Sequence, residues 1–238
     1  MSDASFSFRK IAVSAFGPSL LFSIGEGSIL PIIALSARDL GASVALAGLI
    51  VGLIGIGSLF SNIPAALIIA RYGERRSMVA AAAFSVLAMI FCLIPNQIWL
   101  LALGVLMIGM ASSVLMLARQ TYLIEAVSIH MRARAMSTLG GTRRIGIFIG
   151  PFLGAALMHY MGLPGAYWIA IVAMLSSGLL AFTVPDLEDH PASKNAGANM
   201  APTLTNIARH HWQIFLTLGF GILLVSGLRS ARQIVIPL

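Results

Sequence analysis

The chain has 238 residues, of which 58% are hydrophobic and 10% are charged. Soluble domains carry roughly 25% charged residues, so the composition excludes an ordinary water-soluble protein and indicates a lipid-covered surface. The net charge of +7 does not indicate a nucleic-acid-binding protein, because the basic residues are spread in short clusters between apolar runs. The single cysteine, Cys92, excludes a disulfide framework and a cysteine-based metal site.

Long uncharged runs predict membrane-spanning helices. No charged residue lies between Arg76 and Arg119, or between Arg144 and Asp186. Each gap is about twice the ~20 residues that a helix needs to cross the hydrocarbon core, and turn residues interrupt each gap once. Taken along the chain, we predict six complete spans at 11–35, 43–70, 77–95, 98–118, 142–161 and 165–183, and the start of a seventh near Trp212.

The distribution of Lys and Arg predicts the orientation of these spans. The outer turns hold Arg38 alone, whereas the inner segments are rich in basic residues, which predicts a cytoplasmic N-terminus. We expect a six-helix unit at 1–183, a flexible cytoplasmic linker at 184–211 and an incomplete seventh helix at 212–238. The inner basic residues are Arg9, Lys10, Arg71, Arg75, Arg76, Arg132, Arg134, Lys194 and Arg209.

A short pattern recurs in the first and seventh predicted spans. Aligning Pro31 with Pro237, each inside an apolar segment, places Glu26 opposite Arg232. Such repetition is typical of transporters built from repeats, although a proline between apolar residues is also common in membrane helices.

The loop between the second and third spans is basic. Gly73 permits a tight reversal, and Arg71, Arg75 and Arg76 can hold helix-end carbonyls or acidic partners on neighbouring helices. A purely topological role stays open, because any short cytoplasmic loop is expected to be basic.

The fifth span carries a glycine face. Gly146, Gly150 and Gly154 are four residues apart, so they line one side of a helix and allow another helix to approach closely. Pro151 removes one helical hydrogen bond and favours a kink. Ordinary small-residue packing explains the same spacing, but the combination with proline is more specific than a lone pair of glycines.

Glu26 is an acid deep inside a complete span. An acid near a helix centre costs about 3 kcal/mol on insertion, so Glu26 is a candidate for proton exchange or substrate binding. The alternative is a static partner to an arginine. Arg229 and Arg232 share a helix face, which predicts a Glu26–Arg232 pair across a central cavity, unless the arginines extend to the outer interface.

Three further arginines lie near the cytoplasmic ends of the fourth and fifth spans. Arg119, Arg143 and Arg144 either brace helix ends or face the cavity, where one of them would bind an anionic substrate. The five histidines show no ligand spacing, so we expect no metal site. The spans lack G-x-S-x-G, H-E-x-x-H and a plausible Ser/His/Asp set, so we do not expect an enzyme.

These motifs resemble those of the major facilitator superfamily. That family has a basic G-x-x-x-D-R-x-G-R-R loop between its second and third helices, and its drug-antiporter branches carry G-x-x-x-G-P-x-x-G in the fifth. Ala70 stands at the aspartate position of the loop and Ala66 at its early glycine. The matching residues are Arg71, Gly73 and Arg75 or Arg76 in the loop, and Gly146, Gly150, Pro151 and Gly154 in the fifth span. The resemblance implies that the loop, with Arg71, Gly73, Arg75 and Arg76, gates the cytoplasmic side.

The resemblance implies an all-α polytopic membrane protein with a six-helix N-terminal bundle of two inverted three-helix repeats and a truncated seventh helix. It implies secondary transport of a small molecule by alternating access, favouring proton-coupled efflux, in a bacterial inner membrane. The expected partners are substrate, protons and lipid, with no cofactor and no nucleic acid. The family uses two six-helix halves, so we expect a missing C-terminal half or a second copy to complete the pathway. A truncated, non-transporting fragment, or a half-size protein acting only by assembly, stays open.

Overall fold

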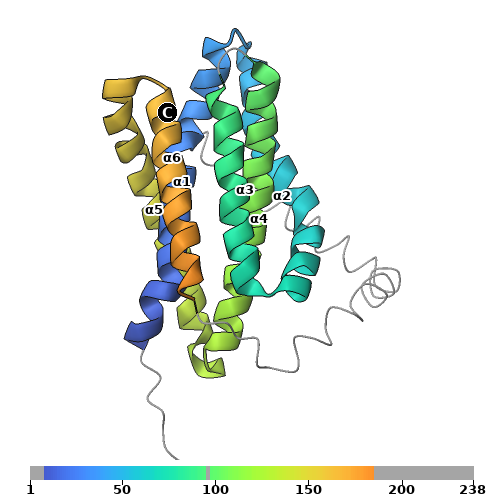
Figure 1. Cartoon of the computed structure of the whole chain (residues 1–238), viewed down its shortest axis with the longest axis vertical. Helices are drawn as coiled ribbons and strands as arrows, with labels where there is room; N and C mark the ends of the chain where they lie inside the picture. Colours follow the sequence, from blue (N-terminus) through green and yellow to red (C-terminus); the bar gives the residue numbers. More distant parts are fainter. Residues whose placement is uncertain (1–7, 95–96, 185–238) are drawn as a thin grey trace, which may run out of the picture. The chain divides into compact units, whose positions relative to one another are not determined.

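The structure is a computed structural model that describes residues 8–94 and 97–184. They belong to the first of two units of the chain, Met1–His190. The linker beyond residue 184 and the predicted seventh helix, with Arg229 and Arg232, lie outside the described residues. The helices are α1 (Phe8–Asp39), α2 (Val44–Tyr72), α3 (Glu74–Leu93), α4 (Ile98–Ala126), the short 3-10 helix η1 (Ile129–Met131), α5 (Arg132–Met161) and α6 (Pro164–Phe182) (Figure 1).

The six predicted spans are confirmed as helices that are long and apolar enough to cross a membrane. Most of the helices extend beyond the predicted apolar runs, and the extensions are longest in α4, which continues to Ala126, and in α5, which begins at Arg132. Hydropathy identifies only the apolar part of a helix, which lies in the hydrocarbon core. The helix itself continues into the polar region, because its backbone hydrogen bonds do not require apolar side chains. In α5 the hydroxyl groups of Thr138 and Thr142 donate to carbonyls four residues earlier.

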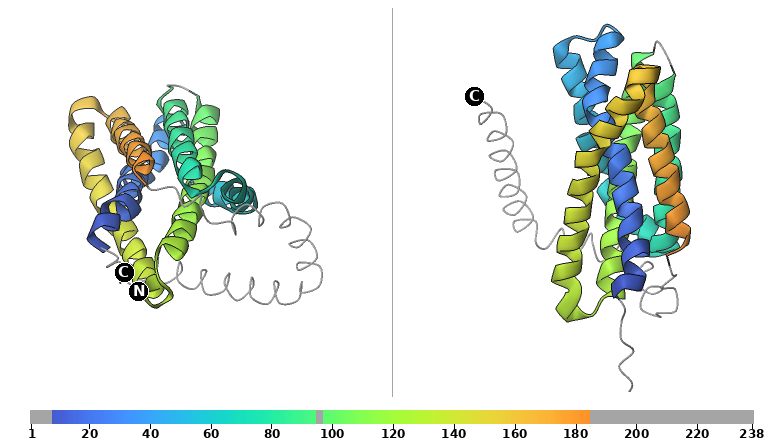
Figure 2. Two further views of the ribbon diagram at one scale, coloured as in Figure 1. Left: turned by 60° about the horizontal axis from the view of Figure 1, so that its bottom comes forward. Right: turned by 90° about the vertical axis from the view of Figure 1, so that its left-hand side faces the viewer.

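The packing of the helices has an internal two-fold pattern. Helix α1 packs mainly against α5 and α6, whereas α4 packs mainly against α2 and α3. Exchanging the first three helices with the second three interchanges these contacts and leaves the α3–α6 contact in place. Helices α1 and α4 run in opposite directions (Figures 1 and 2). The described residues therefore form two inverted three-helix repeats, which confirms the predicted fold class.

Glycines set two close helix crossings, α1–α5 and α2–α4, each of which joins one repeat to the other. A Cβ added at Gly150 on α5 would lie 2.6 Å from the backbone nitrogen of Ser28 on α1. A Cβ added at Gly109 on α4 would lie 2.8 Å from the carbonyl carbon of Ile54 on α2. Real Cβ atoms do not approach a backbone so closely, so both crossings depend on the missing side chain.

The turn between α2 and α3 is a single residue, Gly73, with φ of 82°. Residues with a side chain rarely adopt this backbone conformation, so glycine permits the abrupt reversal. The arginines beside this turn lie at the same end of the bundle as the link between α4 and α5 (Figure 1).

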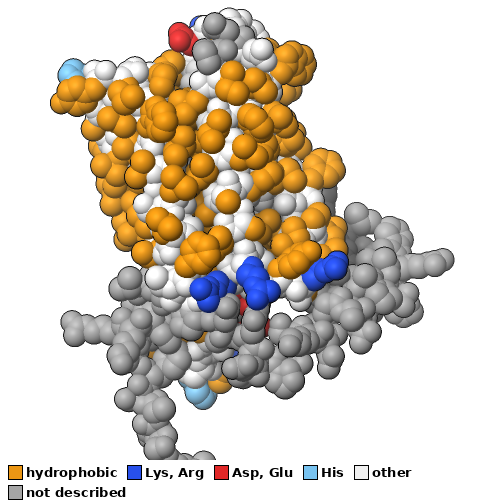
Figure 3. Space-filling model, in the orientation of Figure 1, with side chains coloured by type: hydrophobic (Ala, Val, Ile, Leu, Met, Phe, Trp, Pro, Cys, Tyr) orange, Lys and Arg blue, Asp and Glu red, His pale blue; other side chains and the backbone are white. Residues whose placement is uncertain are grey.

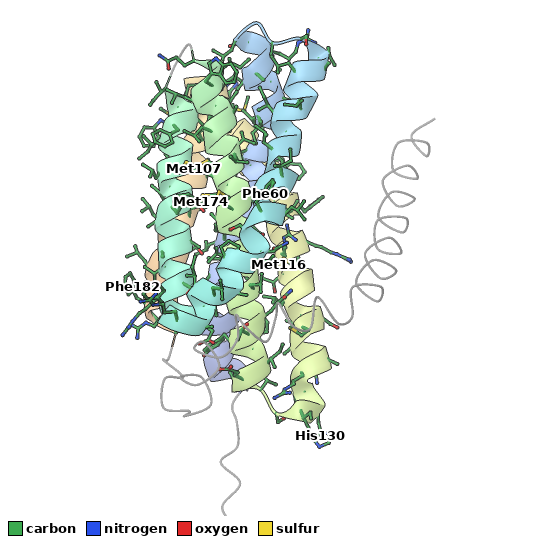
Figure 4. The ribbon with its side chains drawn as sticks, turned by 90° about the vertical axis from the view of Figure 1, so that its right-hand side faces the viewer. Phe60, Met107, Met116, His130, Met174 and Phe182 are labelled. Atoms are coloured by element: carbon green, nitrogen blue, oxygen red, sulfur yellow. The ribbon has the colours of Figure 1, made fainter. Side chains whose placement is uncertain are left out.

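The surface separates apolar and basic side chains. Hydrophobic side chains cover most of the described surface in Figure 3, and Lys and Arg side chains gather at its lower edge. Large apolar side chains are exposed on α2 and α5, including Phe60, which is 74% exposed (Figure 4). Phe148 on α5 is also exposed. This arrangement fits helices that meet lipid or another apolar surface along their length, with basic residues at one membrane boundary.

Candidate functional site

A cavity of about 130 Å³ lies between α1, α4 and α5. Its wall combines apolar and polar side chains and includes Met116, which Figure 4 labels on α4. Because α1 belongs to the first repeat and α4 and α5 to the second, the cavity lies where the repeats meet. Its lining residues are Ser19, Phe22, Ser23 and Glu26 from α1, Ser112, Met116, Arg119 and Gln120 from α4, and Met136, Leu139, Gly140 and Arg143 from α5.

A polar stripe on α1 brings Glu26 to this cavity. Ser19, Ser23 and Glu26 follow one another at intervals of four and three residues, so their side chains share one helix face. All three are buried, and only 5% of Glu26 is exposed. A buried carboxylate is costly unless a positive charge or hydrogen-bond donors stabilise it.

Arg143 on α5 supplies the positive charge. Its Nη2 atom lies 3.5 Å from both carboxylate oxygens of Glu26, which makes an ion pair between the two repeats. The pair is asymmetric, because the Glu26 side chain is 6% exposed and the Arg143 side chain is 43% exposed. The carboxylate therefore depends on a partner that itself reaches water.

Arg119 on α4 is a second cation at the cavity, and it is 6% exposed. Its Nη1 atom donates a hydrogen bond to the Ser19 hydroxyl, and its guanidinium group lies 5.7 Å from the centre of the Phe22 ring. Its Nε atom has no hydrogen-bond partner among the described residues. Glu26 attracts this group electrostatically and Arg143 repels it.

Of the three arginines singled out on α4 and α5, the structure brings two to Glu26. Arg119 and Arg143 line the cavity, whereas Arg144 is exposed and lies outside the lining. The predicted Glu26–Arg232 pair stays a prediction, because Arg232 lies outside the described residues. In the described part of the chain the partner of Glu26 is Arg143.

The glycines of the fifth span face α1. Gly146, Gly150 and Gly154 all lie against its backbone or short side chains between Leu20 and Ser28. Arg143 precedes Gly146 by three residues and therefore lies on the same side of α5. Pro151 lies within α5, which continues to Met161.

The predicted gating loop lies away from this cavity, at the α2–α3 turn. The Arg71 guanidinium lies 5.6 Å from the centre of the Tyr72 ring. Arg75 and Arg76 are in the first turn of α3 and line an open hollow of about 420 Å³ with Phe182 of α6. Both arginines make interactions of their own. A gating role for this loop stays a prediction.

Several lining residues were missed by sequence reasoning. Ser19 and Ser23 were detectable, because their spacing to Glu26 marks one face of α1. Ser112 and Met116 were detectable in the same way, because they precede the predicted candidate Arg119 at intervals of four and three residues along α4. Gln120 follows Met116 by four residues and Met136 precedes Gly140 by four, so each shares a helix face with other lining residues. Spacing alone does not say which helix face turns toward the cavity, because that depends on how the helices are rotated in the bundle.

The chain is similar to known membrane proteins. "Multidrug resistance protein MdtG" of Enterobacter lignolyticus (strain SCF1) is 29% identical over 176 residues, which are 72% of this chain and 42% of the relative. "Inner membrane transport protein YajR" of Escherichia coli (strain K12) is 26% identical over 229 residues, which are 94% of this chain and 49% of the relative. The chain thus spans about half the length of the curated relatives it matches.

The sequence profile of the Major Facilitator Superfamily matches residues 16–236. This range contains every residue that lines the cavity and every glycine of the two crossings. Together with the two inverted three-helix repeats, the match fixes the family, and the chain belongs to the major facilitator superfamily.

Proposed function

We propose that the chain contributes a six-helix half to a secondary transporter that moves a small molecule by alternating access. Family membership and relatives named for transport and multidrug resistance support the transport function. The relatives' names also favour efflux and a place in a bacterial inner membrane. The basic residues gathered at one end of the bundle support a cytoplasmic N-terminus.

The observation that carries this proposal is the buried Glu26 carboxylate between two arginines. Ionisable groups inside a membrane bundle are rare and commonly mark substrate or proton pathways. Here the carboxylate lines a cavity, and its ion-pair partner Arg143 is partly exposed. Glu26 is therefore the group that we assign to proton exchange.

The ion pair also suggests how a proton would act on the helices. With Glu26 ionised, its attraction to Arg143 holds α1 of one repeat to α5 of the other. Protonation removes this attraction and leaves Arg119 and Arg143 as two like charges at one cavity. A proton would thereby weaken the contact between the repeats, which supplies a two-state element for alternating access.

The domain organisation is part of the proposal. Residues 1–183 would form the N-terminal half, 184–211 a cytoplasmic linker and 212–238 the start of a second half. The outward apolar side chains of α2 and α5 would then meet lipid or the other half of the pathway. A C-terminal half or a second copy of the chain would supply the opposite wall.

Transport in everted membrane vesicles tests the proposal. The 238-residue chain and the complete reading frame that encodes it are expressed separately, and a panel of amphiphiles and small metabolites is offered with an imposed pH gradient. We expect the complete protein to accumulate at least one compound in a gradient-dependent manner. Transport by the 238-residue chain alone would mean that copies assemble into a pathway. No gradient-dependent transport of any compound by either protein would contradict the proposal.

A further inference from the structure

Arg119 is held at the cavity with unused hydrogen-bonding capacity. A guanidinium group carries five N–H donors, and the described contacts of Arg119 are one hydrogen bond to Ser19 and the face of Phe22. Its Nε atom is buried without a partner in the described part of the chain. A buried donor without an acceptor is costly, which indicates a site that an acceptor completes.

The charge of the cavity indicates the sign of that acceptor. Among the described lining residues the charged ones are Glu26, Arg119 and Arg143, so the sum is +1 when Glu26 is ionised. Arg143 is partly exposed and already contacts Glu26, whereas Arg119 is buried. Arg119 is therefore the cavity cation that has no direct ion-pair contact among the described residues, and an anion is the ligand that would supply one.

The remaining wall indicates what the anion is attached to. Phe22, Met116 and Leu139 add apolar surface to the cavity beside its polar groups. Its volume of about 130 Å³ is smaller than the roughly 300–1,000 Å³ of pockets that enclose drug-sized ligands. The cavity thus suits the charged end of a molecule, whose apolar body would extend beyond it.

We propose that this cavity binds the anionic end of a small amphiphilic organic anion, with Arg119 as its main donor. The inference rests on the proposed transport function, because it names the class of molecule that the transporter would carry. It goes further in excluding lipophilic cations, which a cavity of net positive charge repels.

The anion and a proton on Glu26 do not compete for one group. The anion binds a guanidinium group, whereas the proton binds the Glu26 carboxylate. Protonation removes the negative charge of Glu26, which attracts Arg119 on α4 and Arg143 on α5. The anion therefore binds at least as tightly when Glu26 is protonated or replaced by glutamine. In proton-coupled efflux, the coupling of anion to proton would then arise because only some combinations of bound anion and bound proton allow the protein to reorient across the membrane.

Equilibrium binding to the purified chain in lipid nanodiscs tests the inference. The probes are 1-naphthoate, 1-naphthylmethylammonium and 1-naphthylmethanol, which share an apolar body and carry charges of −1, +1 and 0. Titration calorimetry against empty nanodiscs corrects for partition into lipid. We expect saturable binding of the anion, at least tenfold tighter than that of the cation. Equal or tighter binding of the cation would overturn the inference.

Matched variants locate the binding group. Arg119→Met should weaken naphthoate binding at least tenfold, Arg119→Lys should weaken it less, and the exposed control Arg144→Met should leave it unchanged. Thermal unfolding of each variant shows whether it is folded. Naphthoate binding by folded Arg119→Lys and Arg119→Met with wild-type affinity would contradict the inference. Chloride that binds as tightly as naphthoate would also contradict it, because the site would then hold an inorganic ion.

The binding assay separates this inference from the proposed function. Glu26→Gln should retain naphthoate binding at wild-type strength or tighter, even though we expect it to lose proton-coupled transport. Intact, Arg119-dependent binding without any gradient-dependent transport would contradict only the transport proposal. Gradient-dependent transport together with naphthoate binding that is unchanged by substitution of Arg119 would contradict only the inference that the site binds an organic anion.

Discussion

The two glycine-mediated helix crossings of the bundle are packed in the same way, but the side chains beside them differ in charge. At the α1–α5 crossing, Gly27 and Gly150 let the helix backbones touch, and at the α2–α4 crossing Gly57 and Gly109 do the same. The two crossings are equivalent under exchange of the three-helix repeats. The α1–α5 crossing lies beside an ion pair whose carboxylate is buried, whereas the α2–α4 crossing is joined by neutral groups.

The neutral crossing is centred on Ser113 of α4. Its hydroxyl lies 2.6 Å from the Ser58 hydroxyl of α2, and it also lies 3.0 Å from the Ser58 carbonyl oxygen and from Asn62 Oδ1. These bonds do not change with a proton gradient, because neither hydroxyl nor amide groups titrate near neutral pH. The comparison teaches that close packing is common to both crossings, while the described groups that can respond to protons lie at the α1–α5 crossing.

The largest expected effect comes from filling a crossing. Gly150→Leu would force a side chain into the backbone of α1, so we expect a loss of about 3 kcal/mol or more of stability. Gly52→Leu is the matched control, because a Cβ at Gly52 on α2 meets nothing within 4 Å. The unfolding temperature of each variant is measured from the reactivity of Cys92 as the protein is heated. Equal unfolding temperatures for the two variants would show that the α1–α5 crossing is not tightly packed.

The next largest effect comes from the ion pair. Arg143→Glu places two acids together and Glu26→Arg places three arginines together, so each reversal should destabilise the protein and abolish transport. The double reversal restores one pair and should recover part of both losses, with a coupling energy of about 0.5–3 kcal/mol. A double-mutant cycle on the unfolding free energy measures it. Strictly additive effects would contradict a direct Glu26–Arg143 interaction.

The smallest effect is expected at the neutral crossing. Ser113→Ala removes the hydroxyl that joins α2 and α4, and interhelical hydrogen bonds in membrane proteins contribute on average about 0.6 kcal/mol. We therefore expect a small loss of unfolding free energy and no change in how transport depends on the pH gradient. Thr138→Ala, which removes only a local bond on α5, is the control. Loss of gradient dependence in Ser113→Ala would remove the contrast between the two crossings.

The helices and their glycine faces could be predicted from the sequence, because both follow from hydropathy and spacing. The partner of Glu26 was not predicted as Arg143, since the pairing depends on how α1 and α5 are rotated against each other. One clue was present, because Arg143 lies three residues before Gly146 and seven before Gly150. That spacing places Arg143 on the side of α5 that packs against α1, and it places the neighbouring Arg144 on another side.

The role of Glu26 is tested most directly by proton-coupled transport in everted vesicles, comparing Glu26→Gln with the control Arg144→Met in the complete reading frame. The account predicts that Arg144→Met retains gradient-driven transport. It predicts that Glu26→Gln still exchanges substrate down its own concentration gradient but no longer responds to the pH gradient. Normal gradient-driven transport by Glu26→Gln would contradict the account, since the buried carboxylate would then serve only to pair with Arg143.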